Sequence, residues 1–177
     1  MRPIRICLHG PESTGKSTLA CALAKAMGTV AVPEFGRIYC EAFGNRCDLE
    51  DLRAIRTGEE LMIRAAERKA NDFLVLDTDA VMTAIWADVL LGARPADLER
   101  VDDAADLYLL ADIDVPFAAD AIRYFPDPTV RRDFFERCRR ELERRKLPYV
   151  VISGDRQTRL RGALDAIRER FGRVPRL

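Results

Sequence analysis

Short apolar runs alternate with longer amphipathic stretches along the chain. Runs of four or five residues rich in Ile, Leu and Val are typical of strands buried on both faces of a parallel sheet. Five runs have this form, at residues 4–8, 29–32, 73–76, 107–111 and 149–152. Apolar residues at helical spacing fill the stretches between them and predict helices over residues 16–27, 49–70, 81–91, 131–145 and 156–171.

This alternation predicts an α/β fold. Strands that alternate with helices form a parallel sheet, here of five strands, with helices on both faces. At 177 residues the chain has the length of one domain, which we assign to residues 1–177. The helix over residues 49–70 is expected to be weak near Gly58. Residues 112–123 have no clear period, and we predict a lid over approximately residues 112–133.

The composition narrows the class of protein. Apolar residues make up 48% and charged residues 33%, as in globular proteins, and no apolar stretch reaches the length of a membrane-spanning helix. Twenty-nine Lys and Arg balance twenty-nine Asp and Glu, so neither nucleic acid nor a membrane is an expected partner. The five cysteines lack CxxC spacing, and we expect no signal peptide before the first strand. We expect reduced thiols and a cytoplasmic location, and leave the oligomeric state open.

One motif carries specific chemistry. Residues 10–17 read Gly-Pro-Glu-Ser-Thr-Gly-Lys-Ser, a GxxxxGKS phosphate loop (P-loop) between the first strand and the first helix. Backbone N–H groups and the helix dipole hold polyphosphate in such a loop, and the lysine reaches the β and γ phosphates. We therefore expect ATP and Mg²⁺ as cofactors in a fold like that of P-loop NTPases and nucleoside monophosphate kinases. The predicted nucleotide contacts are Gly10, Glu12, Ser13, Thr14, Gly15, Lys16, Ser17 and Thr18, with Lys16 also catalytic and Ser17 a magnesium ligand.

Carboxylates follow two other predicted strands. Asp77 and Asp79 follow the run at residues 73–76, at the edge where P-loop proteins commonly hold magnesium with an aspartate. We predict a metal or catalytic role for at least one of them, with Asp77 the metal ligand, while the other caps the helix that follows. Glu34 follows the second strand and is a candidate to orient or deprotonate an acceptor hydroxyl. Which of the three acids is the base stays open.

Arginines near the predicted lid could neutralise a transferring phosphate. Arg123 is the catalytic candidate, and Arg131 and Arg132 are further candidates, with Arg131 assigned to the nucleotide. Arginines in so basic a segment could equally form a solvated face. The chain has no Asn-Lys-x-Asp guanine motif and is barely larger than a nucleotide site, which favours a small-molecule kinase over a switch or motor. An ATP-binding regulatory module with slow hydrolysis is the alternative.

Four segments resemble, in order and spacing, the ribosylnicotinamide kinase domain of the bacterial NAD-biosynthesis regulator. They are residues 10–19, 34–37, 77–79 and 114–123. The resemblance covers nearly the whole chain and implies ATP-dependent phosphorylation of the 5′-hydroxyl of nicotinamide riboside to nicotinamide mononucleotide. The regulator's HxGH nucleotidyltransferase motif is missing, since His9 is the only histidine. Another nucleoside, nucleotide or small metabolite is the alternative acceptor.

The resemblance also directs the search for the acceptor and adenine sites. It implies adenine near residues 153–156, where Asp155 is assigned to the nucleotide although its side chain is expected to cap the last helix. A pyridinium riboside calls for aromatic faces and carboxylates. Each aromatic residue could instead belong to the core, and Tyr124 near the lid is left unassigned. The predicted acceptor contacts are Glu34, Phe35, Arg37, Tyr39, Asp79 and Trp86.

Overall fold

The computed structural model describes residues 2–118 and 124–172, which form one five-stranded sheet. Its strands are β1 (Ile4–His9), β2 (Ala31–Val32), β3 (Phe73–Asp77), β4 (Leu107–Ala111) and β5 (Tyr149–Ile152). Every pair of neighbours is parallel, in the order β2-β3-β1-β4-β5. The predicted fold class is confirmed.

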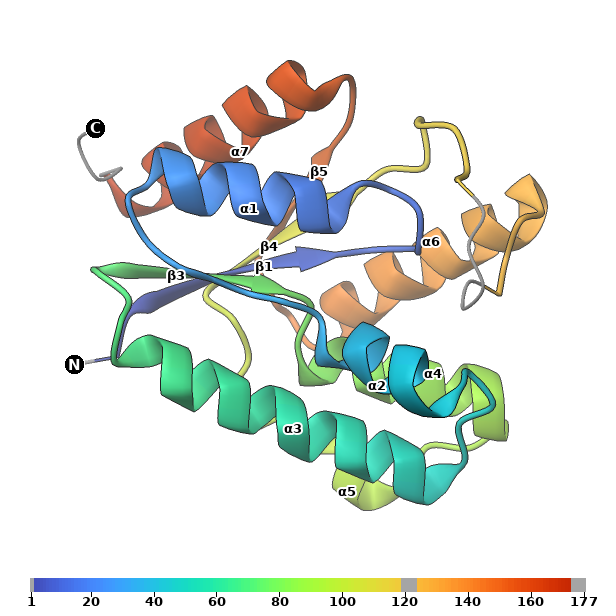
Figure 1. Cartoon of the computed structure of the whole chain (residues 1–177). Helices are drawn as coiled ribbons and strands as arrows, with labels where there is room; N and C mark the ends of the chain where they lie inside the picture. Colours follow the sequence, from blue (N-terminus) through green and yellow to red (C-terminus); the bar gives the residue numbers. More distant parts are fainter. Residues whose placement is uncertain (1, 119–123, 173–177) are drawn as a thin grey trace.

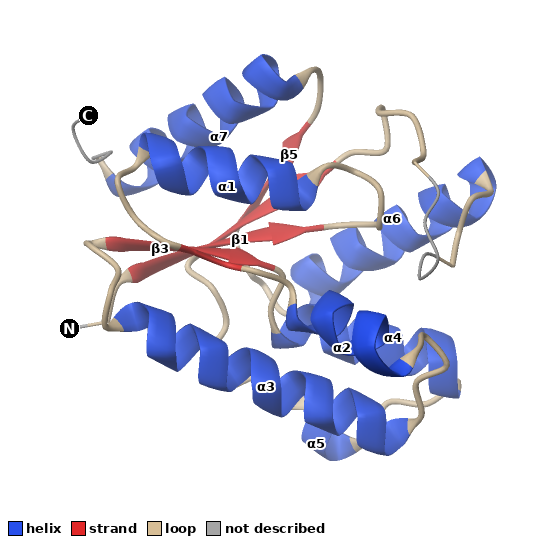
Figure 2. Ribbon diagram, viewed as in Figure 1, coloured by secondary structure: helices blue, strands red, loops and turns tan. Residues whose placement is uncertain are grey.

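Helices cover both faces of the sheet (Figure 1). They are α1 (Lys16–Ala26), α2 (Phe35–Phe43), α3 (Leu49–Glu67), α4 (Ala80–Leu91), α5 (Ala96–Glu99), α6 (Pro128–Arg144) and α7 (Arg156–Phe171). Figure 2 shows α1 and α7 on one face, with α3, α4 and α6 on the other. Across the described ranges no helix combines the length and the apolar character needed to cross a membrane.

The central strands are buried on both faces, which explains their continuous apolar runs. In β1, Ile6 and Leu8 pack in the cluster with α1 and α7, while Cys7 packs in the cluster with α4 and α6. Tyr108 and Leu110 of β4 belong to the second cluster. Alternate residues thus serve opposite layers, as the period of two of a strand requires.

The centre of the sheet is also where the chain changes direction. β1 lies between β3 and β4: the connection after β1 leads through α1 to β2 on one side of it, whereas the connection after β3 leads through α4 and α5 to β4 on the other side. Parallel sheets leave a crevice at the carboxyl ends of the strands at such a point. In register, Leu8 of β1 pairs with Asp77, and His9 pairs with Leu110. The P-loop and the Asp77 carboxylate therefore emerge at the same edge.

Two helices and one boundary differ from the sequence prediction. Helices α2 and α5 were not expected, and α2 begins directly after Glu34. Gly36 lowers the intrinsic helix propensity of α2. The stability of this helix therefore comes mainly from its packing on α3. Helix α6 begins at Pro128, three residues before the predicted start, with Asp127 accepting a hydrogen bond from Thr129 N at 2.7 Å. The lid prediction, which extends to residue 133, thus includes the first turn of a helix.

Gly58 does not weaken α3, which is continuous from Leu49 to Glu67. A Cβ atom placed on Gly58 would lie 2.2 Å from Cε1 of Phe35. The glycine therefore leaves room for the first aromatic ring of α2. This contact brings α2 close to α3 beside the predicted site.

Candidate nucleotide and acceptor site

The loop between β1 and α1 has the backbone that phosphate binding requires. Gly10 has φ +121°, and a Cβ atom there would lie 2.8 Å from the carbonyl oxygen of Ala111, so only glycine fits. Gly15, with φ +80°, directly precedes α1. The loop therefore leads into a helix N-terminus, as anion binding requires.

Lys16 lies folded over this loop. Its Nζ donates a hydrogen bond to the carbonyl oxygen of Pro11 at 2.8 Å, and the residue is 7% exposed. Thr14 Oγ1 donates to the same carbonyl at 2.8 Å. Ser17 and Thr18 are exposed at the start of α1. A bound phosphate would offer the ammonium group a stronger acceptor than this neutral carbonyl.

Two predicted nucleotide contacts bind the lid through their side chains. The Glu12 carboxylate accepts a hydrogen bond from Phe125 N at 2.6 Å, and Ser13 Oγ accepts one from Ala118 N at 2.8 Å. Arg131, which is 4% exposed, donates to the carbonyl oxygen of Ser13 at 3.3 Å. The outer side of the P-loop is thereby tied to the lid and to the first turn of α6. For Glu12 and Ser13, nucleotide binding remains a prediction for their backbone N–H groups.

The other lid arginines have different positions. Arg132 forms an ion pair with Asp112 at 3.4 Å and lies over the ring of Phe135. The predicted catalytic Arg123 lies outside the described residues. Arg131 is thus the lid arginine that contacts the P-loop among those described.

Arg159 of α7 supports the P-loop from behind, and the sequence interpretation missed it. Its guanidinium donates to the carbonyl oxygens of Thr14 at 2.8 Å, Gly154 at 2.8 Å and Asp112 at 3.1 Å. It also forms an ion pair with Asp114. One buried side chain therefore connects the P-loop with the segments after β4 and β5. Because α7 contains several arginines, nothing in the sequence distinguishes Arg159 as a residue that supports the P-loop.

Asp155 caps α7, as expected. Its carboxylate accepts a hydrogen bond from Thr158 N at 2.8 Å, and its backbone is extended. The side chain is thereby occupied. A contact between this loop and adenine would come from the backbone.

A pocket opens from the P-loop into the space between α2, α3 and α4. It holds about 820 Å³ of empty space, counting the part open to solvent, which is within the usual size of small-molecule sites. Beyond the P-loop its walls are mainly apolar, and a few carboxylate and hydroxyl side chains are distributed among the apolar ones. The lining includes Lys16, Glu34, Arg37, Cys40, Cys47, Leu52, Ile55, Glu59, Thr78, Met82, Thr83, Trp86, Leu90 and Tyr124.

Glu34 enters this pocket close to the P-loop. The residue has an extended backbone at the N-terminal end of α2 and is half-buried. Burial raises the pKa of its carboxyl group, and the nearby Lys16 opposes that rise. Arg37, one turn later, also lines the pocket and pairs with Glu41 at 2.9 Å. Both residues lie where the sequence predicts an acceptor.

Asp77 and Asp79 have separate roles. Asp77 ends β3 and is 4% exposed, and its Oδ1 has no hydrogen-bond partner among residues 2–118 and 124–172. Thr78 has φ +76°, which is uncommon for a β-branched residue and turns the chain sharply between the two acids. An unpaired buried carboxylate oxygen beside a P-loop is what a magnesium ligand would require.

Asp79 caps a helix instead of lining the acceptor pocket. Its carboxylate accepts hydrogen bonds from Val81 N at 3.1 Å and from the hydroxyl of Tyr108 at 2.5 Å. It lines a different cavity, which includes Arg5 and Glu60. The structure thus places this side chain in the capping alternative, and its catalytic and acceptor-binding roles remain predictions. Burial raises the pKa of this carboxyl group, and its hydrogen bonds oppose the rise.

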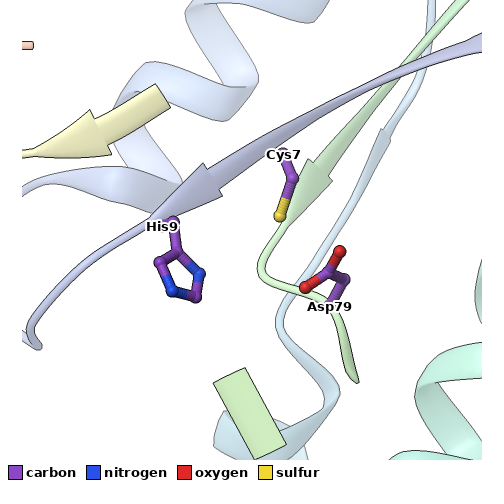
Figure 3. Close-up of side chains that lie close together, drawn as sticks. All are labelled: Cys7, His9 and Asp79. Atoms are coloured by element: carbon purple, nitrogen blue, oxygen red, sulfur yellow. The ribbon is translucent and has the colours of Figure 1, made fainter. Parts of the chain in front are cut away.

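Asp79 also belongs to a buried group with Cys7 and His9 (Figure 3). One ligand atom from each residue lies within 4.8 Å of the others. Burial raises the pKa of the Cys7 thiol well above its usual value and lowers that of His9 to about 3. The thiol and the imidazole are thus held neutral in the core, separate from the predicted magnesium ligands Ser17 and Asp77.

One of the three predicted aromatic contacts lines the pocket. Trp86 does so, with its ring 5.3 Å from that of Tyr124, which lines the pocket as well. Phe35 packs against Gly58 instead, and Tyr39 donates a hydrogen bond to Asp51 at 2.6 Å. Both belong to the apolar cluster between α2, α3 and α4. Neither lines the pocket, and their substrate contacts remain predictions.

Glu59 is a pocket residue that the sequence interpretation missed. It lies on α3 and is 3% exposed. The spacing from Leu52 and Ile55 places it on the apolar stripe of the helix, where a glutamate is unusual. That charged residue in an apolar stripe was the available signal.

Comparison with known proteins defines the family. A family model described as AAA domain matches residues 5–159. The chain belongs to this AAA domain family. The trifunctional NAD biosynthesis/regulator protein NadR of Escherichia coli strain K12 is 28% identical over 174 residues, which cover 94% of this chain and 42% of the relative. The chain therefore spans less than half the length of that protein.

Solved structures agree with this placement. Crystal structures of NadR in complex with NR and in complex with NAD and AMP-PNP each match with a TM-score of 0.74 and 26% identity. The matches cover 99% of this chain and 54% and 52% of those chains. Thymidylate kinase from Candida albicans matches with a TM-score of 0.67 and 14% identity, over 96% of this chain and 92% of that one. The fold is that of a P-loop kinase.

Proposed function

We propose that this chain is an ATP-dependent kinase that transfers the γ-phosphate to the 5′-hydroxyl of nicotinamide riboside, forming nicotinamide mononucleotide. The observation that carries this proposal is one continuous pocket that begins at the P-loop Lys16, passes Glu34 and extends to Trp86. Its apolar walls and carboxylates suit a cationic aromatic nucleoside. The similarity to NadR crystallised with NR supports the choice of acceptor.

The P-loop side of the pocket would hold ATP. The loop backbone and Lys16 would bind its phosphates, and the similarity to NadR crystallised with AMP-PNP supports this assignment. The hydroxyl of Ser17 and the unpaired oxygen of Asp77 fit Mg²⁺, which prefers hard oxygen ligands. Bound magnesium would neutralise charge on the phosphates. Arg131 is placed to add positive charge on the lid side of the loop.

Glu34 is the acid best placed to receive the proton of the acceptor hydroxyl. Asp77 is assigned to the metal, and the carboxylate of Asp79 is occupied by its cap and by Tyr108. A carboxylate with a raised pKa is a stronger base than an exposed one. In phosphoryl transfer most of the gain comes from positioning, so Glu34 would chiefly orient the hydroxyl toward the γ-phosphate.

A coupled ADP-release assay with ATP, Mg²⁺ and a panel of acceptors tests the proposal. The panel contains nicotinamide riboside, common nucleosides, nucleoside monophosphates and shikimate, and a Lys16→Met variant controls for contaminating kinases. We expect selective turnover of nicotinamide riboside, with nicotinamide mononucleotide identified by chromatography. Turnover of another acceptor would replace the substrate and keep the kinase. No turnover above the variant's background would favour an ATP-binding regulatory module.

A further inference from the structure

The pocket contains a second carboxylate whose surroundings differ from those of Glu34. Glu59 lies on α3, and together with Leu52 and Ile55 it forms the wall that this helix contributes to the pocket. Met82 and Trp86 of α4 line the same pocket. A glutamate that is only 3% exposed in such a wall costs folding free energy unless a partner compensates for its burial.

Only one oxygen of Glu59 is paired within the described part of the chain. Its Oε1 accepts a hydrogen bond from Thr78 Oγ1 at 3.2 Å, whereas Oε2 is buried and has no hydrogen-bond partner there. The Thr78 bond fixes the carboxylate at the tip of β3. The unpaired oxygen therefore belongs to a held side chain in the wall of a ligand-sized pocket.

No cation is among the described groups that most affect the pKa of Glu59, although Arg5, Arg56 and Arg64 line a second cavity that Glu59 also borders. Burial raises the pKa of its carboxyl group most, and the nearby Asp79 and Glu34 raise it further. Lys16 and Arg37, the cations that line the pocket, act on Glu34. A ligand that brings both a positive charge and an N–H donor to Glu59 would supply what the protein omits.

The proposed acceptor has both properties. Nicotinamide riboside carries a pyridinium charge and a carboxamide whose NH₂ group donates hydrogen bonds. Nicotinic acid riboside has the same ring and ribose, but a carboxylate replaces the amide. The two compounds therefore differ only in the group that would meet a buried glutamate.

We propose that Glu59 selects the amide form of the acceptor over the acid form by accepting a hydrogen bond from the carboxamide NH₂ on Oε2. Thr78 holds the other oxygen, and the pyridinium ring lies in the apolar part of the pocket beside Trp86. The pyridinium charge of the acceptor opposes the rise in the pKa of Glu59 and favours its ionised form. The acid form would then place a carboxylate against the Glu59 carboxylate in a site with little water, which like-charge repulsion disfavours strongly. This specificity role rests on the proposed kinase function and extends it.

The test compares kcat/KM for the two ribosides in the wild type, Glu59→Gln and Glu60→Gln. The Glu60 control neutralises an adjacent glutamate that pairs with Arg56 and lies outside the pocket. We expect the wild type and the control to prefer the amide by about 100-fold or more. Glu59→Gln should narrow that preference by about 10-fold or more, with most of the gain in kcat/KM for the acid form and little change in the KM for ATP.

The possible failures are distinguishable. A wild type that phosphorylates both ribosides equally well, or a folded Glu59→Gln enzyme with the wild-type preference, would overturn the role of Glu59 while the kinase function stands. Turnover of neither riboside by the wild type would instead overturn the proposed function. If Glu59→Gln does not fold by circular dichroism, Glu59→Asp serves as the second variant. It retains the charge, and we expect it to retain discrimination against the acid while losing affinity for the amide; loss of that discrimination would count against the proposal.

Discussion

Replacing Gly58 by alanine should destabilise this protein, although the same change normally stabilises a helix. In the interior of an exposed helix, alanine is better than glycine by about 1 kcal/mol. Here a Cβ atom would lie 2.2, 2.4 and 2.6 Å from three atoms of the Phe35 ring, well inside van der Waals contact. The ring must therefore move, and α2 must move with it or lose its packing on α3.

The magnitude follows from the two opposing terms. Overpacking a closely packed site costs about 1 to 3 kcal/mol. The upper end of this cost exceeds the gain of about 1 kcal/mol in helix propensity. Since the ring has to leave its place completely, we expect the upper end and a net loss of about 1 to 2 kcal/mol. For a chain of this length, that corresponds to a fall in Tm of about 3 to 6 °C.

Gly162 provides a matched control within α7. A Cβ atom there would approach no atom more closely than 3.8 Å, so Gly162→Ala should gain helix propensity without a clash and raise Tm by about 2 to 4 °C. In a Phe35→Ala background the clash at Gly58 is absent, and Gly58→Ala should then stabilise as well. Thermal unfolding followed by circular dichroism measures all four variants. A rise in Tm for Gly58→Ala in the wild-type background would refute the packing argument.

Three further predictions concern single residues. Lys16→Met should lower kcat by about 1,000-fold, because it removes the charge that stabilises the transferring phosphate, while circular dichroism stays native; near-normal turnover would contradict the role of the P-loop. Arg159→Lys should lower the free energy of unfolding in urea by about 3 kcal/mol and raise the KM for ATP, since one ammonium group cannot replace the bonds of the guanidinium to Thr14, Gly154 and Asp114. An unchanged unfolding free energy and KM would show that Arg159 does not support the P-loop. The pKa of His9 is about 3 in the folded chain against 6.5 ordinarily, so unfolding between these pH values takes up a proton. The neutral, buried His9 therefore contributes its full stability above pH 6.5, and this contribution falls by about 1.4 kcal/mol per pH unit as the pH decreases toward 3. In urea unfolding measured from pH 7 to 4, His9→Gln should show a shallower loss of unfolding free energy with falling pH than the wild type. Equal pH dependence in the two proteins would refute this assignment.

Strong periodicity made most of the fold predictable. The bounds of β4, β5 and α7 match the expected runs, because buried strands must be apolar and α7 starts at a capping aspartate. Helix α2 also has apolar residues at helical spacing (Phe35, Ile38, Tyr39 and Phe43), but it is short, Gly36 lies in its first turn and none of its residues is fully buried. Its stability comes from contacts with α3, which are distant in sequence. Pattern alone cannot register contacts of that kind.

Missing α2 also explains why two predicted acceptor contacts, Phe35 and Tyr39, do not line the pocket. If residues 34–39 formed an irregular segment, as the sequence analysis assumed, all of their side chains could reach the substrate. In the helix, Gly36, Arg37 and Cys40 share the side that lines the pocket, whereas Phe35 and Tyr39, four residues apart, turn toward α3. The P-loop was predictable because its chemistry fixes both residue types and spacing. The position of Glu59 in an apolar stripe could have been noticed, but its proposed role could not be predicted, because that role depends on what α2 and α4 place opposite it.

The same packing contact connects the two carboxylates of the acceptor pocket. Phe35 directly follows Glu34, and Gly58 directly precedes Glu59, so we expect the packing of the Phe35 ring on Gly58 to influence how far apart the two acids lie. If Glu34 orients the hydroxyl and Glu59 reads the carboxamide, this distance must match the length of one nucleoside. Gly58→Ala should therefore change both kcat and the preference for amide over acid, whereas Arg159→Lys, which acts on the P-loop, should leave that preference unchanged. An acceptor preference that survives Gly58→Ala would mean that the two acids are positioned independently.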